Sequence, residues 1–194
     1  MTDGRKKKIG LFGGSFDPVH SGHLMVASFI AQNSDLDEVW LNLSPCNPLK
    51  DKARESNDED RLNMLRIAVE GIKFLSVCDV ELTMPYPSYT ISTLRLLRER
   101  YPDCDFTLVV GSDNWNLFDR WKDSEAIIKE FGVIVYPRPG YPVDFLPEGV
   151  AVVEAPLIQL SSTFIRKNVK EGKDMNFFLP QAVYQYIIER NLYK

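Results

Sequence analysis

Residues 13–23 read Gly13-Gly14-Ser15-Phe16-Asp17-Pro18-Val19-His20-Ser21-Gly22-His23 and follow directly on the apolar run Ile9–Phe12. The apolar run is typical of a buried strand, and the paired glycines after it predict a tight turn. From Gly22 to Gln32 the apolar residues indicate a largely buried helix. The chain therefore opens with a strand, a glycine turn and a helix, the order in which an α/β fold begins.

The same alternation of strand and helix continues along the chain. Further apolar strands are predicted at Glu38–Leu43, Phe74–Val77, Phe106–Val110, Gly132–Tyr136 and Val150–Ala155. Helices are predicted at Thr90–Arg100, Ser124–Glu130, Ser161–Glu171 and Pro180–Asn191, and another runs to about Glu70 from a capping box formed by Ser56 and Glu59. Apolar strands that alternate with helices predict a doubly wound parallel sheet, Rossmann-like, with helices on both faces. Without an internal repeat or linker, we expect residues 1–194 to form a single domain.

Composition narrows the class of protein. The 194 residues are 44% hydrophobic and 26% charged, as in ordinary globular proteins, and the net charge is −4. A negative chain without a basic stripe argues against nucleic-acid binding. With no apolar run near the ~20 residues that span a bilayer and no signal-peptide pattern, we expect a cytoplasmic protein with no membrane partner. The three cysteines form no CxxC pair, so neither disulfides nor zinc are indicated.

The two histidines of the chain, His20 and His23, both lie in the glycine turn. A spacing of three places both rings on one side of a first helical turn, where each can donate a hydrogen bond to phosphate and carry charge near neutral pH. Gly13 and Gly14 allow close approach of backbone to a ligand, and Gly22 leaves space where a side chain would intrude. A helix start after a strand favours phosphate binding. The alternative is that one histidine caps the helix while the other lies on the surface.

The turn fits neither a Walker A loop nor a GxGxxG dinucleotide turn, and no third histidine or cysteine cluster supports zinc. It closely resembles the GSFDPxHxGH signature of the HxGH nucleotidyltransferase superfamily. A second stretch, Leu160-Ser161-Ser162-Thr163-Phe164-Ile165-Arg166, resembles that superfamily's ISSTxIR motif, with leucine in place of the first isoleucine. Ser161 and Ser162 are good N-cap residues, and Arg166, one turn into the helix, can form a fork onto phosphate oxygens. Read alone, this motif would be a capped helix with a surface arginine.

Within the superfamily the chain is most similar to the bacterial nicotinate-nucleotide adenylyltransferases, over almost its whole length. Besides the two signatures, the similarity rests on weaker segments in the right order. These are Asn47-Pro48-Leu49-Lys50, where Leu49 replaces a family histidine, Asp79-x-Glu81, Pro87-Ser88-Tyr89-Thr90, Gly111-Ser112-Asp113, Trp121, and Arg138-Pro139-Gly140-Tyr141.

The resemblance implies that the protein joins AMP from ATP to nicotinate mononucleotide and releases pyrophosphate, with Mg²⁺ carried on the ATP phosphates. It implies catalytic roles for His20, His23 and Arg166. The ATP site would comprise Gly13, Gly14, Ser15, Phe16, Gly22, Ser161, Ser162 and Thr163. Nicotinate mononucleotide would contact Lys50, Thr90, Asp113 and Trp121.

Each weaker segment also has a structural alternative. The Ser88–Thr90 segment can cap a helix, Trp121 can be a core aromatic, Asp113 can be an N-cap and Lys50 a solvated loop residue. Two other functions stay open, namely another HxGH adenylyl- or cytidylyltransferase, such as a pantetheine-phosphate enzyme, and a nucleotide-binding regulatory module without turnover. The presence of both histidines and Arg166 argues against the regulatory module.

Overall fold

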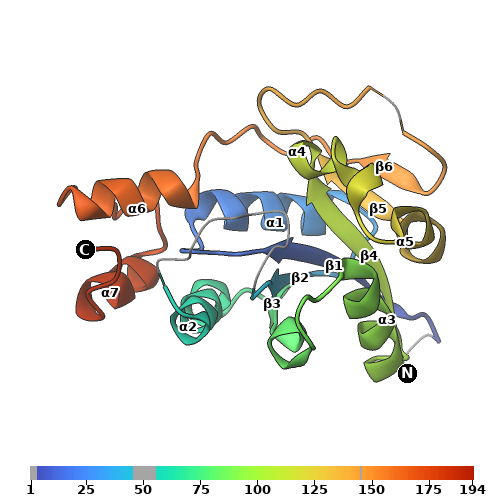
Figure 1. Ribbon diagram of the computed structural model, residues 1–194, viewed down its shortest axis with the longest axis horizontal. Coiled ribbons are helices and arrows are strands. Elements are labelled where there is room, and N and C mark those ends of the chain that lie inside the picture. The colour runs from blue at the N-terminus through green and yellow to red at the C-terminus, as the bar shows by residue number, and fades with distance from the viewer. Residues whose placement is uncertain (1–3, 46–55, 145) are drawn as a thin grey trace.

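The computed structural model describes residues 4–45, 56–144 and 146–194. Six strands form one sheet in the order β3-β2-β1-β4-β5-β6, and every neighbouring pair is parallel (Figure 1). The strands are β1 (Lys7–Gly14), β2 (Glu38–Leu43), β3 (Leu75–Cys78), β4 (Cys104–Gly111), β5 (Val133–Tyr136) and β6 (Val150–Val152).

The strand order reverses between β1 and β4. The chain first builds outward from β1 to β3 and then returns to place β4 against the other side of β1. Beside such a reversal the connections leave the sheet in opposite directions, which opens a crevice at the carboxyl ends of the two strands. The predicted doubly wound parallel sheet is confirmed, and the residues after Gly14 and Gly111 lie at this crevice.

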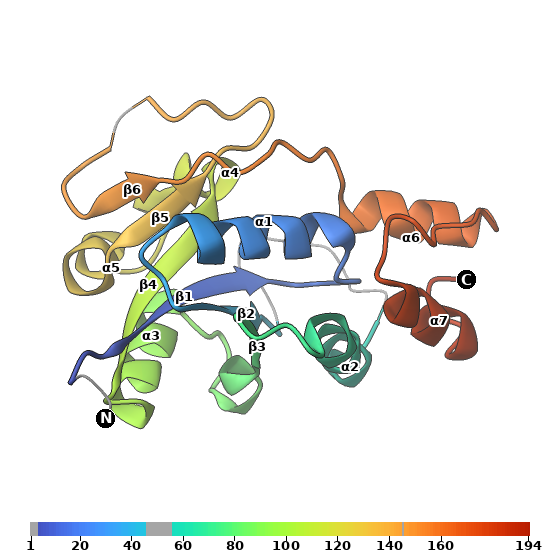
Figure 2. The same cartoon turned by 180° about the vertical axis from the view of Figure 1, so that it is seen from behind.

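Helices cover both faces of the sheet (Figures 1 and 2). One apolar core lies under α1 (Ser21–Asn33), α2 (Asp58–Val69), α6 (Ser162–Lys170) and α7 (Gln181–Glu189), and the other under α3 (Thr90–Arg100) and α5 (Ser124–Phe131). Strand β1 contributes to both, because successive side chains of a strand point to opposite faces. Phe12 belongs to the first core, and Ile9 and Leu11 belong to the second.

Some boundaries differ from the predicted ones. Strand β6 ends at Val152 rather than Ala155, since its pairing with β5 runs from Val150 opposite Val133 to Val152 opposite Val135 and goes no further. The short helices η1 (Val80–Thr83), α4 (Ser112–Trp115) and η2 (Phe118–Arg120) were not predicted, since three or four residues are too few to show a helical period. Within the described residues no helix is both long and apolar enough to cross a membrane.

The predicted capping box at Ser56 is wrong. Asn57 is the N-cap of α2, and its side chain accepts a hydrogen bond from the Asp60 backbone N–H at 2.7 Å. The Ser56 hydroxyl instead donates to the buried carboxylate of Asp17. Ser56 thus serves as a charge-assisted donor to a buried carboxylate, and Asn57 provides the oxygen that accepts the helix N–H.

Replacing Asn57 with alanine should lower the free energy of unfolding by about 1 kcal/mol, because the N-cap acceptor is lost. Asn57→Asp keeps a carbonyl-type acceptor and is the matched control, with stability close to the wild type. Urea denaturation of the three proteins measures the difference. An unchanged midpoint in Asn57→Ala would show that the cap does not stabilise α2.

Candidate active site

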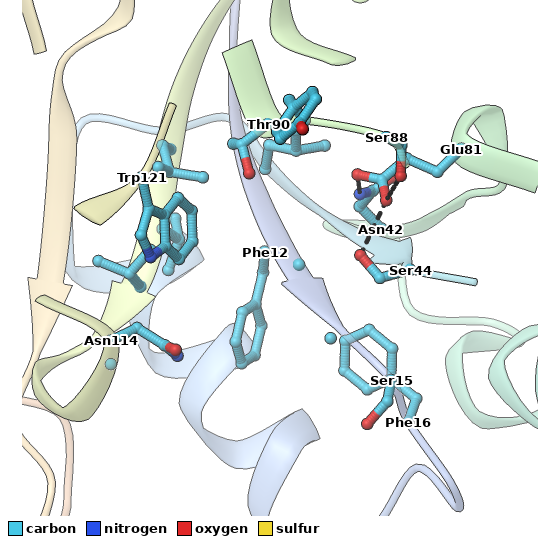
Figure 3. Close-up of a pocket in the computed structure, with 18 of the residues that line it drawn as sticks. Phe12, Ser15, Phe16, Asn42, Ser44, Glu81, Ser88, Thr90, Asn114 and Trp121 are labelled. Carbon is cyan, nitrogen blue, oxygen red and sulfur yellow. Dashed lines mark hydrogen bonds between the residues drawn. The ribbon is translucent and has the colours of Figure 1, made fainter. Parts of the chain in front are cut away.

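A cavity of about 300 Å³ opens at the strand-order reversal (Figure 3). Its floor is formed by the ends of β1 and β4, and its walls come from the turn after β1, the loop after β2, the start of α3 and the segment around η2. In Figure 3, Trp121 and Asn114 lie across the cavity from Glu81 and Ser88, with Phe12 and Phe16 below. The sequence-predicted residues among its lining are Gly13, Gly14, Ser15, Phe16, His23, Thr90 and Trp121.

The two histidines stack on one another at the start of α1. Their ring centroids are 3.7 Å apart with an interplanar angle of 19°, which confirms that both rings lie on one side of the first turn. The Phe16 ring packs against His23 in a T-shaped arrangement, with the two ring centroids 5.0 Å apart. His23 Nδ1 accepts the backbone N–H of His20 at 3.3 Å, so the proton of the neutral ring resides on Nε2. Gly22 fits under the pair because a Cβ there would stand 3.1 Å from His20 Nδ1.

His20 does not carry charge near neutral pH, contrary to the expectation from sequence. Only 3% of its surface is exposed, and it lines a smaller cleft beside the main cavity together with Gly22 and Arg138. Burial, followed by the positive charge of Arg138, lowers the pKa of His20 from 6.5 to about 4. The imidazole is therefore neutral at pH 7 and still provides one N–H donor.

The turn that carries the histidines is held from behind by buried side chains. Phe16 has a left-handed backbone with φ 44°, which is uncommon for a bulky residue and requires support from its surroundings. Arg61, fully buried in α2, donates to the carbonyl oxygens of Ser15 at 2.7 Å and Ser44 at 3.1 Å. Sequence reasoning missed Arg61, because an arginine at a core-facing helix position looks like any surface charge in the sequence.

The second signature packs against the same turn. Ser161 is the N-cap of α6, as predicted, and accepts the Phe164 N–H at 3.2 Å. The Ser162 hydroxyl donates to the Pro18 carbonyl at 2.9 Å, and Arg166 donates to the Asp17 carbonyl at 2.7 Å. Two segments more than 140 positions apart thus meet at one turn, and Figures 1 and 2 both show α6 beside the start of α1.

The residues of the second signature do not line the main cavity. Among the described residues that form its wall, Ser161, Ser162, Thr163 and Arg166 are absent. Arg166 is half-buried behind the turn, while Ser161 and Thr163 are exposed beside it. The structure therefore brings this group to the turn but not into the cavity floor.

The opposite wall joins the start of α3 to the segment after β4. Thr90 is the first residue of α3 and lines the cavity with Trp121. Within the described chain, the Trp121 indole N–H is buried and has no hydrogen-bond partner. Lys122 also lines the cavity, with Nζ 4.4 Å from the centre of the Tyr89 ring. This wall offers hydroxyl and N–H donors together with positive charge.

Asp113, which was predicted to contact a ligand, does not line the cavity. Asp113 is the second residue of α4 rather than its N-cap, and its carboxylate binds Arg138 at 3.1 Å. Arg138 lines the cavity, whereas Asp113 does not. Lys50 lies outside the described residues.

A buried carboxylate organises the wall formed by β2 and α3. Glu81 is 6% exposed and accepts four hydrogen bonds at 2.7–3.1 Å. The donors are Asn42, Ser44, Ser88 and Thr93 (Figure 3 draws the first three). The segment Asp79-x-Glu81 already stood out in the sequence, but nothing there shows that the carboxylate faces inward.

Comparison with known proteins agrees with this geometry. The Cytidylyltransferase-like family model matches residues 11–168. A protein of Bacteroides fragilis named "Probable nicotinate-nucleotide adenylyltransferase" is 47% identical over 187 residues, covering 95% of this chain and 93% of its own. A protein of the same name from Bacteroides thetaiotaomicron is 47% identical and covers 97% and 95%.

The chain belongs to the nicotinate-nucleotide adenylyltransferase family.

A solved structure shares the fold of this family member. A Plasmodium falciparum nicotinic acid mononucleotide adenylyltransferase, complexed with NaAD, aligns with a TM-score of 0.78 at 24% identity and covers 96% of this chain and 97% of its own. At that identity the likeness establishes the six-stranded arrangement alone.

The pKa of His20 predicts how stability depends on pH. Unfolded His20 takes up a proton near its ordinary pKa of 6.5, whereas folded His20 does so only near pH 4. The unfolded state therefore binds more protons between these values, and this contribution to stability falls as the pH drops through that window. Between pH 7 and pH 5 we expect a loss of about 2 kcal/mol from this residue.

Urea denaturation of the wild type and of His20→Gln at both pH values measures this contribution. The variant should lose less stability on acidification than the wild type does. An equal loss in both proteins would place the pH dependence in other groups.

Proposed function

We propose that this chain transfers AMP from ATP to nicotinate mononucleotide, forming nicotinate adenine dinucleotide and pyrophosphate in NAD biosynthesis. The observation that carries the proposal is the stacked pair His20 and His23, with His23 in the lining of the main cavity and His20 in the adjoining cleft. The relatives' names and the NaAD-bound Plasmodium structure point to the same chemistry.

The cavity supports two substrates that meet end to end. Its lining includes Gly13 to Phe16 and His23, from the end of β1 through the start of α1, and also Thr90 and Trp121. In an in-line reaction, a phosphate oxygen of nicotinate mononucleotide forms a bond to the α-phosphorus of ATP as the bond to the β-phosphate oxygen breaks. A phosphate monoester has its second pKa near ~6, so the attacking oxygen is already ionised and needs no general base. Catalysis then rests on positioning and on hydrogen bonds to developing negative charge.

His23 is assigned to the α- and β-phosphates through its Nε2 proton, and neutral His20 supports it by stacking and by its own N–H. Arg166, Ser161, Ser162 and Thr163 are assigned to the departing pyrophosphate. They stand beside the phosphate-binding turn rather than in the cavity floor. To contact pyrophosphate, the Arg166 guanidinium would have to release the Asp17 carbonyl, or bind the carbonyl and the pyrophosphate at the same time.

Magnesium is proposed to arrive on the ATP phosphates. Across the described residues there is no group of three or more His, Cys, Asp or Glu side chains that could hold a metal ion. Mg²⁺ binds phosphate oxygens and water and does not need a complete set of protein ligands. The described residues therefore fit a metal that is bound chiefly by the substrate. Bound there, the ion would neutralise phosphate charge.

His23→Ala should lower kcat about a hundredfold or more, because one preorganised donor to the transition state is lost. The side chain stacks on His20 and is not part of the apolar core, so the fold should survive. Pyrophosphate release measures kcat, and circular dichroism checks folding. Full activity in a folded His23→Ala protein would exclude the phosphate role.

The wall around Thr90 and Trp121 should favour nicotinate mononucleotide over the nicotinamide form. A carboxylate accepts from hydroxyl and N–H donors, whereas a carboxamide directs its own NH₂ toward some of them. Such a mismatch costs about 1–3 kcal/mol, so kcat/KM should favour the acid roughly ten- to a hundredfold. Thr90→Val should reduce this ratio with little effect on ATP binding.

One assay tests both the activity and the preference. Pyrophosphate release is followed with ATP and each of nicotinate mononucleotide, nicotinamide mononucleotide and phosphopantetheine. Thr83→Val is a matched control, because its hydroxyl donates to the Val80 carbonyl away from the cavity. Turnover of phosphopantetheine alone would replace the proposed substrate, and equal use of acid and amide would refute only the preference.

A further inference from the structure

We infer that Tyr193 is a positioning residue for the adenylyl transfer, because its hydroxyl fixes the phosphate-binding turn through the carboxylate of Asp17. The inference rests on the proposed function for its kinetic consequence, but its geometric content is independent of it.

Asp17 is the point at which the turn is fixed. It lies three residues before His20 and is 4% exposed. Its Oδ1 accepts the Tyr193 hydroxyl at 2.8 Å and also the Ser56 hydroxyl, and the two hydroxyl oxygens are 3.2 Å apart. Its backbone carbonyl accepts Arg166. The side chain and the backbone of a single turn residue are thus held by three separate parts of the chain.

Packing and hydrogen bonding hold the Tyr193 side chain in place beside Asp17. Tyr193 is 5% exposed and belongs to the core beneath α1, α2, α6 and α7, and burial raises the pKa of its hydroxyl, which therefore stays protonated as a donor. Its backbone has φ 63°, a left-handed conformation that is unfavourable for a residue with a large side chain. Such strain persists only where surrounding contacts enforce it, and here the ring packing and the hydrogen bond to Asp17 do so.

The turn needs this support because its own conformation is unfavourable. Phe16, next to Asp17, also has a left-handed backbone, and its ring packs on His23. If Asp17 loses a donor, the turn gains freedom at the residues that set the position of Phe16 and the histidine pair. Displacing groups that position reactants by as little as about 1 Å can lower turnover by about a hundredfold.

Tyr186 provides a matched control within the same part of the fold. Its hydroxyl donates to the Asp60 carboxylate at 2.8 Å and lies between α7 and α2. Tyr193→Phe and Tyr186→Phe therefore each remove one phenol-to-carboxylate hydrogen bond and keep the ring. Of these two hydroxyls, that of Tyr193 is hydrogen-bonded to the turn. A general loss of stability should therefore appear in both variants, whereas an effect on the turn should appear in Tyr193→Phe alone.

The experiment combines steady-state kinetics with hydrogen–deuterium exchange. We expect Tyr193→Phe to lower kcat about tenfold with an unchanged KM for nicotinate mononucleotide, and to speed exchange in peptides covering residues 13–20. Tyr186→Phe should match the wild type in both. Ser56→Ala removes a second donor to Asp17 and should shift both readouts in the same direction, which preserves the test if Tyr193→Phe does not fold.

The outcomes separate this inference from the proposed function. Equal exchange in residues 13–20 and equal kcat for the two tyrosine variants would overturn the positioning role. Failure of the wild type to release pyrophosphate from ATP and nicotinate mononucleotide would refute the proposed function instead. The exchange of residues 13–20 would then decide by itself whether Tyr193 fixes the turn.

Discussion

The site depends on hydrogen bonds to the backbone carbonyls of the turn between β1 and α1. The carbonyls of Ser15, Asp17 and Pro18 each accept a side chain from another element, supplied by Arg61, Arg166 and Ser162. A carbonyl oxygen near an anionic ligand would repel it, and an unpaired buried carbonyl costs free energy. Side chains that donate to these oxygens pair the buried carbonyls and reduce their repulsion of an anion. The same hydrogen bonds join α2 and α6 to a turn that neither helix adjoins in sequence.

The stacked histidines show how burial determines the chemistry of this turn. Two charged imidazoles 3.7 Å apart would repel each other, whereas a neutral His20 can stack on its neighbour without that penalty. Positive charge at this edge of the sheet then comes from arginine and lysine side chains such as Arg138 and Lys122, which line the cavity. The histidines provide directed donors, and at the buried His20 a hydrogen bond is electrostatically stronger than in water.

The sequence was sufficient for the fold and for the position of the glycine turn with its two histidines, because both depend on local pattern. Apolar strands alternating with helices predict the sheet, and the glycine turn with its two histidines falls at the end of the first strand. The residues that hold the turn could not be predicted. Arg61, Asp17 and Tyr193 act through contacts between distant segments, and the histidine pKa depends on burial that only packing creates. The capping box at Ser56 failed for the same reason, since its competitor Asp17 is 39 positions away.

Glu81 has a consequence for how this wall of the cavity can evolve. One buried carboxylate satisfies donors from β2, from the loop after it, from the segment before α3 and from α3 itself. Losing the carboxylate would leave several buried polar groups without their acceptor at once. Changing a single donor would leave the other donors still dependent on the carboxylate. The five positions 42, 44, 81, 88 and 93 are therefore expected to be inherited as a set. Divergence among relatives at this wall should proceed by concerted replacement rather than by independent single substitutions.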